Sequence, residues 1–143
     1  MIKINFPEPA FRFKKEQGKE WIFDECRKKW CVLTPEEWVR QNILQYLIQI
    51  KKYPASLIAI EKEINLGELK KRFDLLVYKD AVPWMIIECK ETKVTLNEQV
   101  LKQVLNYHIS LPTPYLVITN GKETFGYHVQ DGHLLTLAEL PDY

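Results

Sequence analysis

The sequence predicts an α/β (α+β) domain with a central mixed β-sheet flanked by helices and a β-hairpin at the amino-terminal end. Helical and strand-like patterns follow one another in the order αβββαβ over residues 34–143. The chain has 143 residues, of which 46% are hydrophobic, and this is enough apolar surface for one core. It contains no repeat, low-complexity tract or linker. We therefore expect a single domain over residues 1–143, with residues 1–33 as the hairpin extension.

The amino-terminal hairpin is expected to pair residues 11–15 with residues 20–24 around a turn at Gly18. A basic cluster with Trp21 and Trp30 nearby lies in this segment. Its members are Arg12, Lys14, Lys15, Lys19, Arg27, Lys28 and Lys29. Because the net charge of the chain is only +1, any DNA contact must be local, and residues 27–29 are our first choice for it. A solvated hairpin face is the alternative interpretation.

Two helices are expected. The first has three start signals, which are Thr34 as the cap, Pro35 at the first position and Glu37 three residues after the cap. It should run to about residue 52 and bury a stripe formed by Val39, Ile43, Tyr46, Leu47 and Ile50. The second helix is expected over residues 94–110, with a buried face formed by Val100, Leu101, Val104, Leu105 and either His108 or Ile109.

Strands are expected between and after these helices. The first three cover residues 57–64, 72–78 and 84–90, and a short loop containing Pro83 makes a hairpin of the last two. Residues 115–119 and 124–129 should pair across the turn signal Asn120-Gly121. A final helical turn is expected within residues 134–140.

Charged side chains interrupt the central hairpin, where buried strands are otherwise predicted. Glu88 and Lys90 are two residues apart, so they share one face of a strand. If the hairpin folds symmetrically about Ala81, Asp74 lies opposite Glu88, with about 5 Å between their Cβ atoms. The same register pairs Phe73 with Cys89 and Leu75 with Ile87 on the other face. We therefore expect one face of the hairpin to be core and the other to be a site.

This set of side chains suits hydrolysis of phosphodiester bonds. Two carboxylates such as Asp74 and Glu88 are hard oxygen ligands of the kind that Mg²⁺ or Mn²⁺ binds. A neighbouring lysine, here Lys90, can orient the attacking water or neutralise charge in the transition state. The alternative is a structural ion pair between Lys90 and one of the two acids.

The pattern of Asp74 followed by Glu88-Cys89-Lys90 resembles the D…(D/E)-x-K signature of the PD-(D/E)xK nuclease superfamily. An ordered series of segments resembles one branch of it, the amino-terminal nuclease domain of type I restriction enzyme R subunits. These segments are residues 33–41, 71–74, 87–90, 103–107 and 115–121. The series departs from the family at Phe73, which stands where proline often precedes the first acid.

The resemblance implies a restriction-endonuclease-like core and a Mg²⁺- or Mn²⁺-dependent deoxyribonuclease. It implies a metal site formed by Asp74, Glu88 and the Cys89 carbonyl, with Lys90 assisting the water. It further implies that Gln103 and Tyr107 support the site, and that Glu37 faces the metal unless its carboxylate caps the helix. The alternative for Gln103 and Tyr107 is that they only line a helix surface. Arg72 could contact phosphate or form an ion pair with Glu63 or Glu68.

Partners and location are expected only in outline. DNA is the expected substrate, and a separate targeting or motor subunit is a possible partner, because the chain has no G-x-x-x-x-G-K-[ST] loop to couple ATP hydrolysis to movement. Three cysteines, no membrane span and no signal-peptide pattern predict a cytoplasmic protein. The competing class is a non-catalytic module of the same fold that binds nucleic acid or protein.

Overall fold

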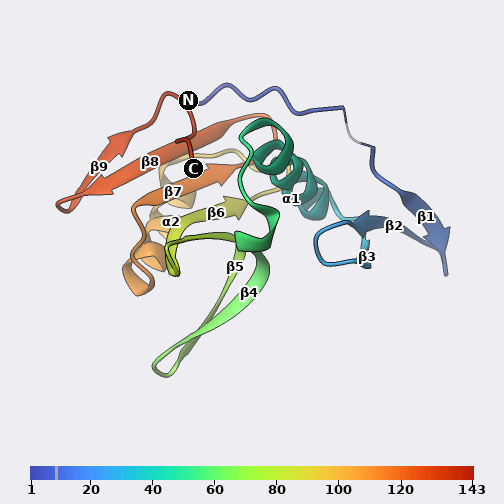
Figure 1. Ribbon diagram of the computed structural model, residues 1–143, viewed down its shortest axis with the longest axis horizontal. Coiled ribbons are helices and arrows are strands. Elements are labelled where there is room, and N and C mark those ends of the chain that lie inside the picture. Colours follow the sequence, from blue (N-terminus) through green and yellow to red (C-terminus); the bar gives the residue numbers. More distant parts are fainter. Residues whose placement is uncertain (9) are drawn as a thin grey trace.

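Two β-sheets and two α-helices make up the computed structural model, which describes residues 1–8 and 10–143, and residue 107 without its side chain. The first sheet contains β1 (Phe13–Glu16), β2 (Lys19–Asp24) and β3 (Lys29–Val32) in that order, all antiparallel. It lies to one side of the larger sheet (Figure 1). The predicted hairpin is confirmed, and β3 is an addition that the sequence reading missed.

The larger sheet has the strand order β4-β5-β6-β7-β8-β9. Its strands are β4 (Ile58–Leu66), β5 (Leu69–Lys79), β6 (Val82–Cys89), β7 (Tyr115–Thr119), β8 (Thr124–Gln130) and β9 (His133–Thr136). All neighbours are antiparallel except β6 and β7, which are parallel and joined by α2 (Glu98–Ser110). The α+β class with a central mixed sheet is therefore confirmed. Strand β9 replaces the final helical turn that was predicted, which was wrong.

Helix α1 (Pro35–Gln45) begins as predicted, because the Thr34 hydroxyl accepts a hydrogen bond from the N–H of Glu37 at 3.0 Å. It continues into a π-helical turn, η1 (Tyr46–Ile50), and a 3₁₀ turn, η2 (Ala55–Leu57), precedes β4. The wider turn shifts the phase of the apolar stripe, so Ile50 is exposed rather than buried.

Helix α2 begins later than predicted. The side chain of Asn97 accepts a hydrogen bond from the N–H of Val100 at 3.1 Å, and this cap sets the start of the helix. His108 is buried and Ile109 is exposed, which decides between the two alternatives for the end of its buried face.

The larger sheet is buried on both faces. Leu75 and Ile87 pack with α1, whereas Leu76 and Ile86 pack with residues of α2. Phe73 belongs to the α2 side together with Leu76, so the alternation of β5 breaks next to Asp74. The expectation that one face is core and the other is a site was therefore wrong. The helices cover the sheet from both sides (Figure 1).

The β5–β6 register follows the prediction where it matters for the site. Leu75 pairs with Ile87, as symmetry about Ala81 requires. Nearer the turn a bulge between Val77 and Tyr78 shifts the pairing by one residue. Its cause is the two-residue turn Asp80–Ala81, with φ of 53° and 64°, because such a turn has its centre between two residues rather than on one.

None of the helices within the described part of the chain is long and apolar enough to cross a membrane.

Candidate functional site

Asp74, Glu88 and Lys90 line the same cleft, which has a volume of about 290 Å³. Its other lining residues are Glu36, Arg40, Glu61, Arg72, Phe73 and Cys89. Asp74 lies in β5, Glu88 near the end of β6, and Lys90 directly after that strand. The structure thus brings these three residues to one cleft, and their roles there remain a prediction.

The position of Asp74 is fixed by a hydrogen bond that continues the strand pairing. The bridged pairs of β5 and β6 stop at Leu75 and Ile87. At the next position the Asp74 carboxylate accepts a hydrogen bond from the N–H of Cys89 at 2.9 Å. The side chain of Cys89 is buried in the core on the α1 side, so only its main chain is available to the cleft.

Glu88 is buried, with 8% of its surface exposed. Burial raises the pKa of Glu88 strongly, the nearby Asp74 carboxylate raises it further, and Lys90 opposes the shift only in part. Two carboxylates in one cleft therefore disfavour the doubly charged state unless a cation joins them.

Arg40 of α1 is the main cation on the Asp74 side of the cleft. Its guanidinium donates to one oxygen of Asp74 from Nε at 3.2 Å and from Nη2 at 2.8 Å. It also forms ion pairs with Glu36, Glu37 and Glu61. Burial alone would lower the pKa of Arg40, but the Asp74 and Glu61 carboxylates raise it, so the group stays charged. Arg40 therefore holds Asp74 in place across a sequence distance that no local pattern reveals.

Glu37 does not line this cleft. Its N–H completes the helix cap, but its carboxylate accepts hydrogen bonds from Arg27 at 2.9 Å and Gln41 at 3.1 Å and pairs with Arg40. Neither of the two predicted roles describes that carboxylate. Its neighbour Glu36 lines the cleft, and its pKa is raised by partial burial and by Asp74.

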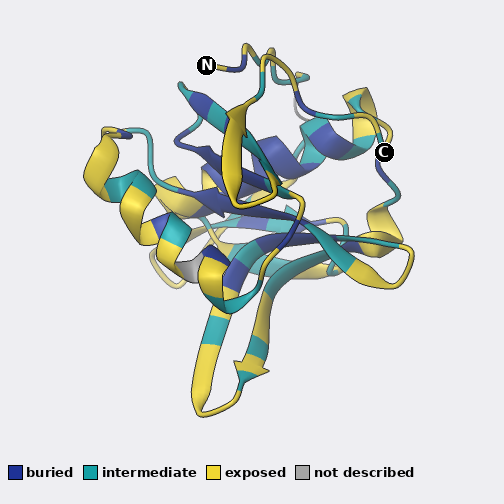
Figure 2. Cartoon of the chain, turned by 90° about the vertical axis from the view of Figure 1, so that its left-hand side faces the viewer, coloured by how far each residue is buried: buried dark blue, intermediate teal, exposed yellow. Residues whose placement is uncertain are grey.

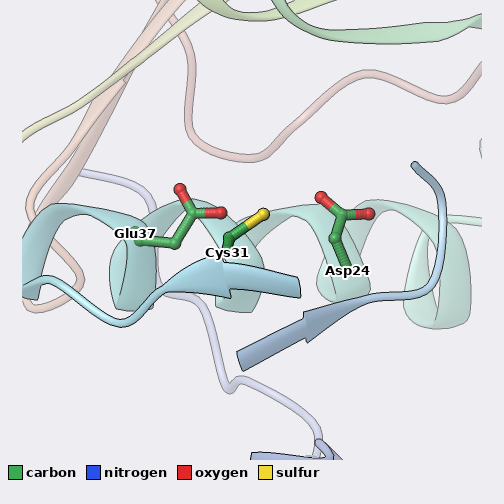
Figure 3. A group of neighbouring side chains, drawn as sticks. All are labelled: Asp24, Cys31 and Glu37. Carbon is green, nitrogen blue, oxygen red and sulfur yellow. The ribbon is translucent and has the colours of Figure 1, made fainter. Parts of the chain in front are cut away.

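A second group of possible metal ligands lies beside α1. Oxygens of Asp24 and Glu37 and the sulfur of Cys31 lie within 4.8 Å of one another, and Figure 3 shows them facing each other from β2, α1 and β3. The guanidinium of Arg27 already binds all three groups. Its Nε lies 2.7 Å from Asp24, and its Nη2 lies 2.9 Å from Glu37 and 3.3 Å from Cys31.

Gln41 also donates hydrogen bonds to this group. Its amide nitrogen donates to Asp24 at 2.8 Å and to Glu37 at 3.1 Å, so a donor rather than an oxygen ligand points into the group. Burial also raises the pKa of the Cys31 thiol, which keeps it protonated. We interpret this group as an ion-pair network that ties the first sheet to α1. It also removes Arg27 from the predicted DNA patch, because its side chain is only 17% exposed.

Gln103 and Tyr107 are the other two residues that were predicted to support the site. Gln103 lies on the exposed face of α2 and does not line the cleft. The side chain of Tyr107 lies outside the described part of the structure, so the predicted Gln103–Tyr107 pair remains a prediction. Arg72 does line the cleft, and it pairs with Glu61 at 2.5 Å, not with the predicted Glu63 or Glu68.

Comparison with known proteins places the chain in a family. Residues 35–141 match the family described as the type I restriction enzyme R protein N terminus. The chain belongs to this family. No curated protein matches the chain. A solved structure from Anabaena variabilis, described as a "putative nuclease belonging to DUF820", is similar at 15% identity over 93% of this chain and 80% of that one, with a TM-score of 0.49. At that distance we draw no argument from it.

The match to the R protein amino-terminal family includes every residue of the cleft and leaves the first sheet outside it. Sequence reasoning missed Glu36, Arg40 and Glu61 as members of the site. Arg40 offered one usable signal, since it falls on the buried side of α1 where a guanidinium needs acidic partners. Glu61 offered none, because its place depends on a local distortion of β4 with φ of 51°.

Proposed function

We propose that this chain is a Mg²⁺-dependent (or Mn²⁺-dependent) endonuclease domain that hydrolyses phosphodiester bonds in DNA. The observation that carries the proposal is the shared cleft of Asp74, Glu88 and Lys90 at the end of the β5–β6 hairpin. Membership of a family named for a restriction enzyme subunit supports the same reaction class. A restriction system is the setting that the family name suggests.

The residues present fit a divalent cation. Asp74 and Glu88 provide hard oxygen atoms, and Glu36 adds a third carboxylate at the rim of the cleft. Burial and the Asp74 carboxylate raise the pKa of Glu88 and Lys90 offsets this only in part, so a divalent ion that joins the two carboxylates would be favoured. The main-chain carbonyl of Cys89 is the further ligand that the family pattern implies. When bound, the ion would supply Lewis-acid stabilisation of phosphate charge and acidify water.

The side chains of the chain have separate parts in this proposal. Asp74 and Glu88 would hold the ion, with Arg40 keeping Asp74 oriented. Lys90 would orient the attacking water and offset negative charge that develops on the phosphate. Arg72, at 65% side-chain exposure on the open side of the cleft, would contact a phosphate of the substrate.

The first prediction concerns the metal. Titration calorimetry with Mg²⁺ or Mn²⁺ should detect binding to the wild-type chain, and Asp74→Ala or Asp74→Asn should abolish it because one of two facing carboxylates is gone. Asp80→Asn is the matched control, since Asp80 is an exposed aspartate in the turn of the same hairpin and asparagine tolerates its positive φ. Equal binding by wild type and Asp74→Asn would overturn the proposal.

The second candidate function is a non-catalytic module that binds nucleic acid or protein. The ion pair between Arg40 and Asp74 favours it, because a guanidinium already neutralises one of the two acids. The same calorimetry separates the candidates. A chain that binds DNA but neither binds divalent ions nor cleaves DNA would belong to this second class.

A partner would complete the proposed activity. These 143 residues contain no ATP-binding loop of the P-loop type, so movement along DNA or selection of a target would be supplied from outside them. Cleavage by the isolated chain should therefore need a divalent ion and no ATP.

A further inference from the structure

The ends of β4 and β5 form a two-stranded ribbon, residues 62–72, that projects from the body of the protein (Figure 1). We call it the arm. It carries side chains that are mostly exposed, as its colouring in Figure 2 shows. Leu69 at its tip is 55% exposed. A two-stranded ribbon is marginally stable in water by itself, so the fold gains little from this extension. We therefore consider the arm as a surface that binds a partner.

The charge of the arm favours a polyanion. It contains four basic residues, Lys62, Lys70, Lys71 and Arg72, and two acidic ones, Glu63 and Glu68. Its formal net charge is therefore +2, whereas that of the whole chain is +1, which leaves −1 for the rest. The arm is therefore a local positive region, and unlike the basic residues of the first sheet it contributes a residue, Arg72, to the cleft.

The register of the arm sorts its side chains onto two faces. Directly opposed residues share a face, so Glu63 and Arg72 lie on the same side as Asn65 and Lys70. The opposite face carries Ile64, paired with Lys71, and the tip pair of leucines. Ile64 packs against the core on the α2 side. The first face is thus fully polar and exposed, and it offers an amide, an ammonium and a guanidinium.

This polar face leads directly into the cleft. Arg72 lines the cleft that contains Asp74, and Lys70 follows it two residues further out on the same face. Glu63 is the one acid on this face, and its ion pair with Lys70 at 3.9 Å is exposed and therefore weak. A polyanion can replace Glu63 at little cost.

We propose that the polar face of the arm binds duplex DNA and leads it to the cleft. Four residue pairs, from Glu63–Arg72 to Leu66–Leu69, extend over roughly 10 Å. The major groove is about 8.5 Å deep and admits a two-stranded ribbon. Arginine, lysine and asparagine are the residue types that contact phosphates and base edges. The inference rests on the proposed function for the nature of the ligand.

The test measures binding without cleavage. Fluorescence anisotropy with a labelled random duplex, in Mg²⁺ and on a Lys90→Ala background, compares Lys70→Glu with Lys52→Glu. Both lysines are exposed. Lys52 lies after η1, whereas the cleft lies at the other end of this helical segment, at the start of α1. Each phosphate contact contributes about 0.9 to the slope of log affinity against log salt, so losing one contact weakens binding roughly eightfold at 0.1 M salt. Lys70→Glu should show this loss and a shallower slope, while Lys52→Glu should not.

The other outcomes each overturn the proposal in a defined way. A loss of binding in Lys28→Glu with none in Lys70→Glu would assign the contact to the first sheet. If Lys70→Glu weakened binding of a single strand of the same length as much as binding of the duplex, the ligand of the arm would be single-stranded rather than duplex DNA. Self-association that Leu69→Ser removes, with DNA binding unchanged in Lys70→Glu, would assign the arm to a second chain. Because binding is read without hydrolysis, a chain that proves not to be a nuclease leaves the result interpretable.

Discussion

Lys90 lowers the pKa of Glu88, against the larger effects of burial and Asp74, so its role can be measured at the scale of one residue. It follows the last residue of β6, is half-buried, and its N–H donates to the carbonyl of Thr119 at 2.8 Å. The backbone contact positions the residue whatever its side chain is. Replacing the side chain should therefore leave the end of β6 in place.

Lys90→Ala should lose most nuclease activity while keeping a melting temperature close to that of wild type. The reason is that the change removes a positive charge from the cleft and leaves the strand pairing intact. Cleavage of a plasmid in Mg²⁺ and thermal unfolding of the same preparation provide both readings. A large loss of stability with unchanged activity per folded molecule would show instead that Lys90 forms a structural ion pair.

Glu88 gives a pH dependence whose sign follows from its raised pKa. A carboxyl group that is more basic in the folded than in the unfolded chain contributes stability at low pH. That contribution declines as pH rises above the ordinary value of 4.5 toward the raised pKa. Without divalent ions, Glu88→Gln should therefore be more stable than wild type at pH 8 and lose this advantage toward pH 5. Denaturant unfolding in EDTA at several pH values measures this difference in stability. A stability gain of Glu88→Gln that did not change with pH would contradict a raised pKa of Glu88.

At the scale of elements, local periodicity predicted more than long-range contacts did. The alternation along β5 and β6 predicted the register at Leu75 and Ile87 correctly. Periodicity did not predict the break in alternation at Phe73 or the burial of both sheet faces, because both depend on where α2 packs. The same limit applies to the site, since the pair Arg40–Asp74 joins residues that are 34 apart in the sequence. Types and spacing of side chains predicted the cleft, and packing decided which acid of α1 enters it.

At the scale of the whole molecule, the charge is small in sum and uneven in distribution. The net charge of +1 hides an arm of +2 beside a cleft lined by four carboxylates, those of Glu36, Glu61, Asp74 and Glu88. The acids would repel a phosphate backbone unless a divalent ion and Arg72 offset them. If the proposed function and the role of the arm hold, productive binding of DNA would depend on the ion and the arm together.

The isolated chain should accordingly bind duplex DNA weakly, without sequence preference and with clear dependence on salt. If the four basic residues of the arm supply the contacts, the slope of log affinity against log salt should be no steeper than about −4. Cleavage should require no ATP and stay low without a targeting partner. Anisotropy with two unrelated duplexes across a salt series, with and without Mg²⁺, checks all of these expectations except cleavage, which gel analysis follows. Tight binding that salt does not weaken, or a strict preference for one duplex, would mean that this domain itself recognises a sequence through residues outside the arm.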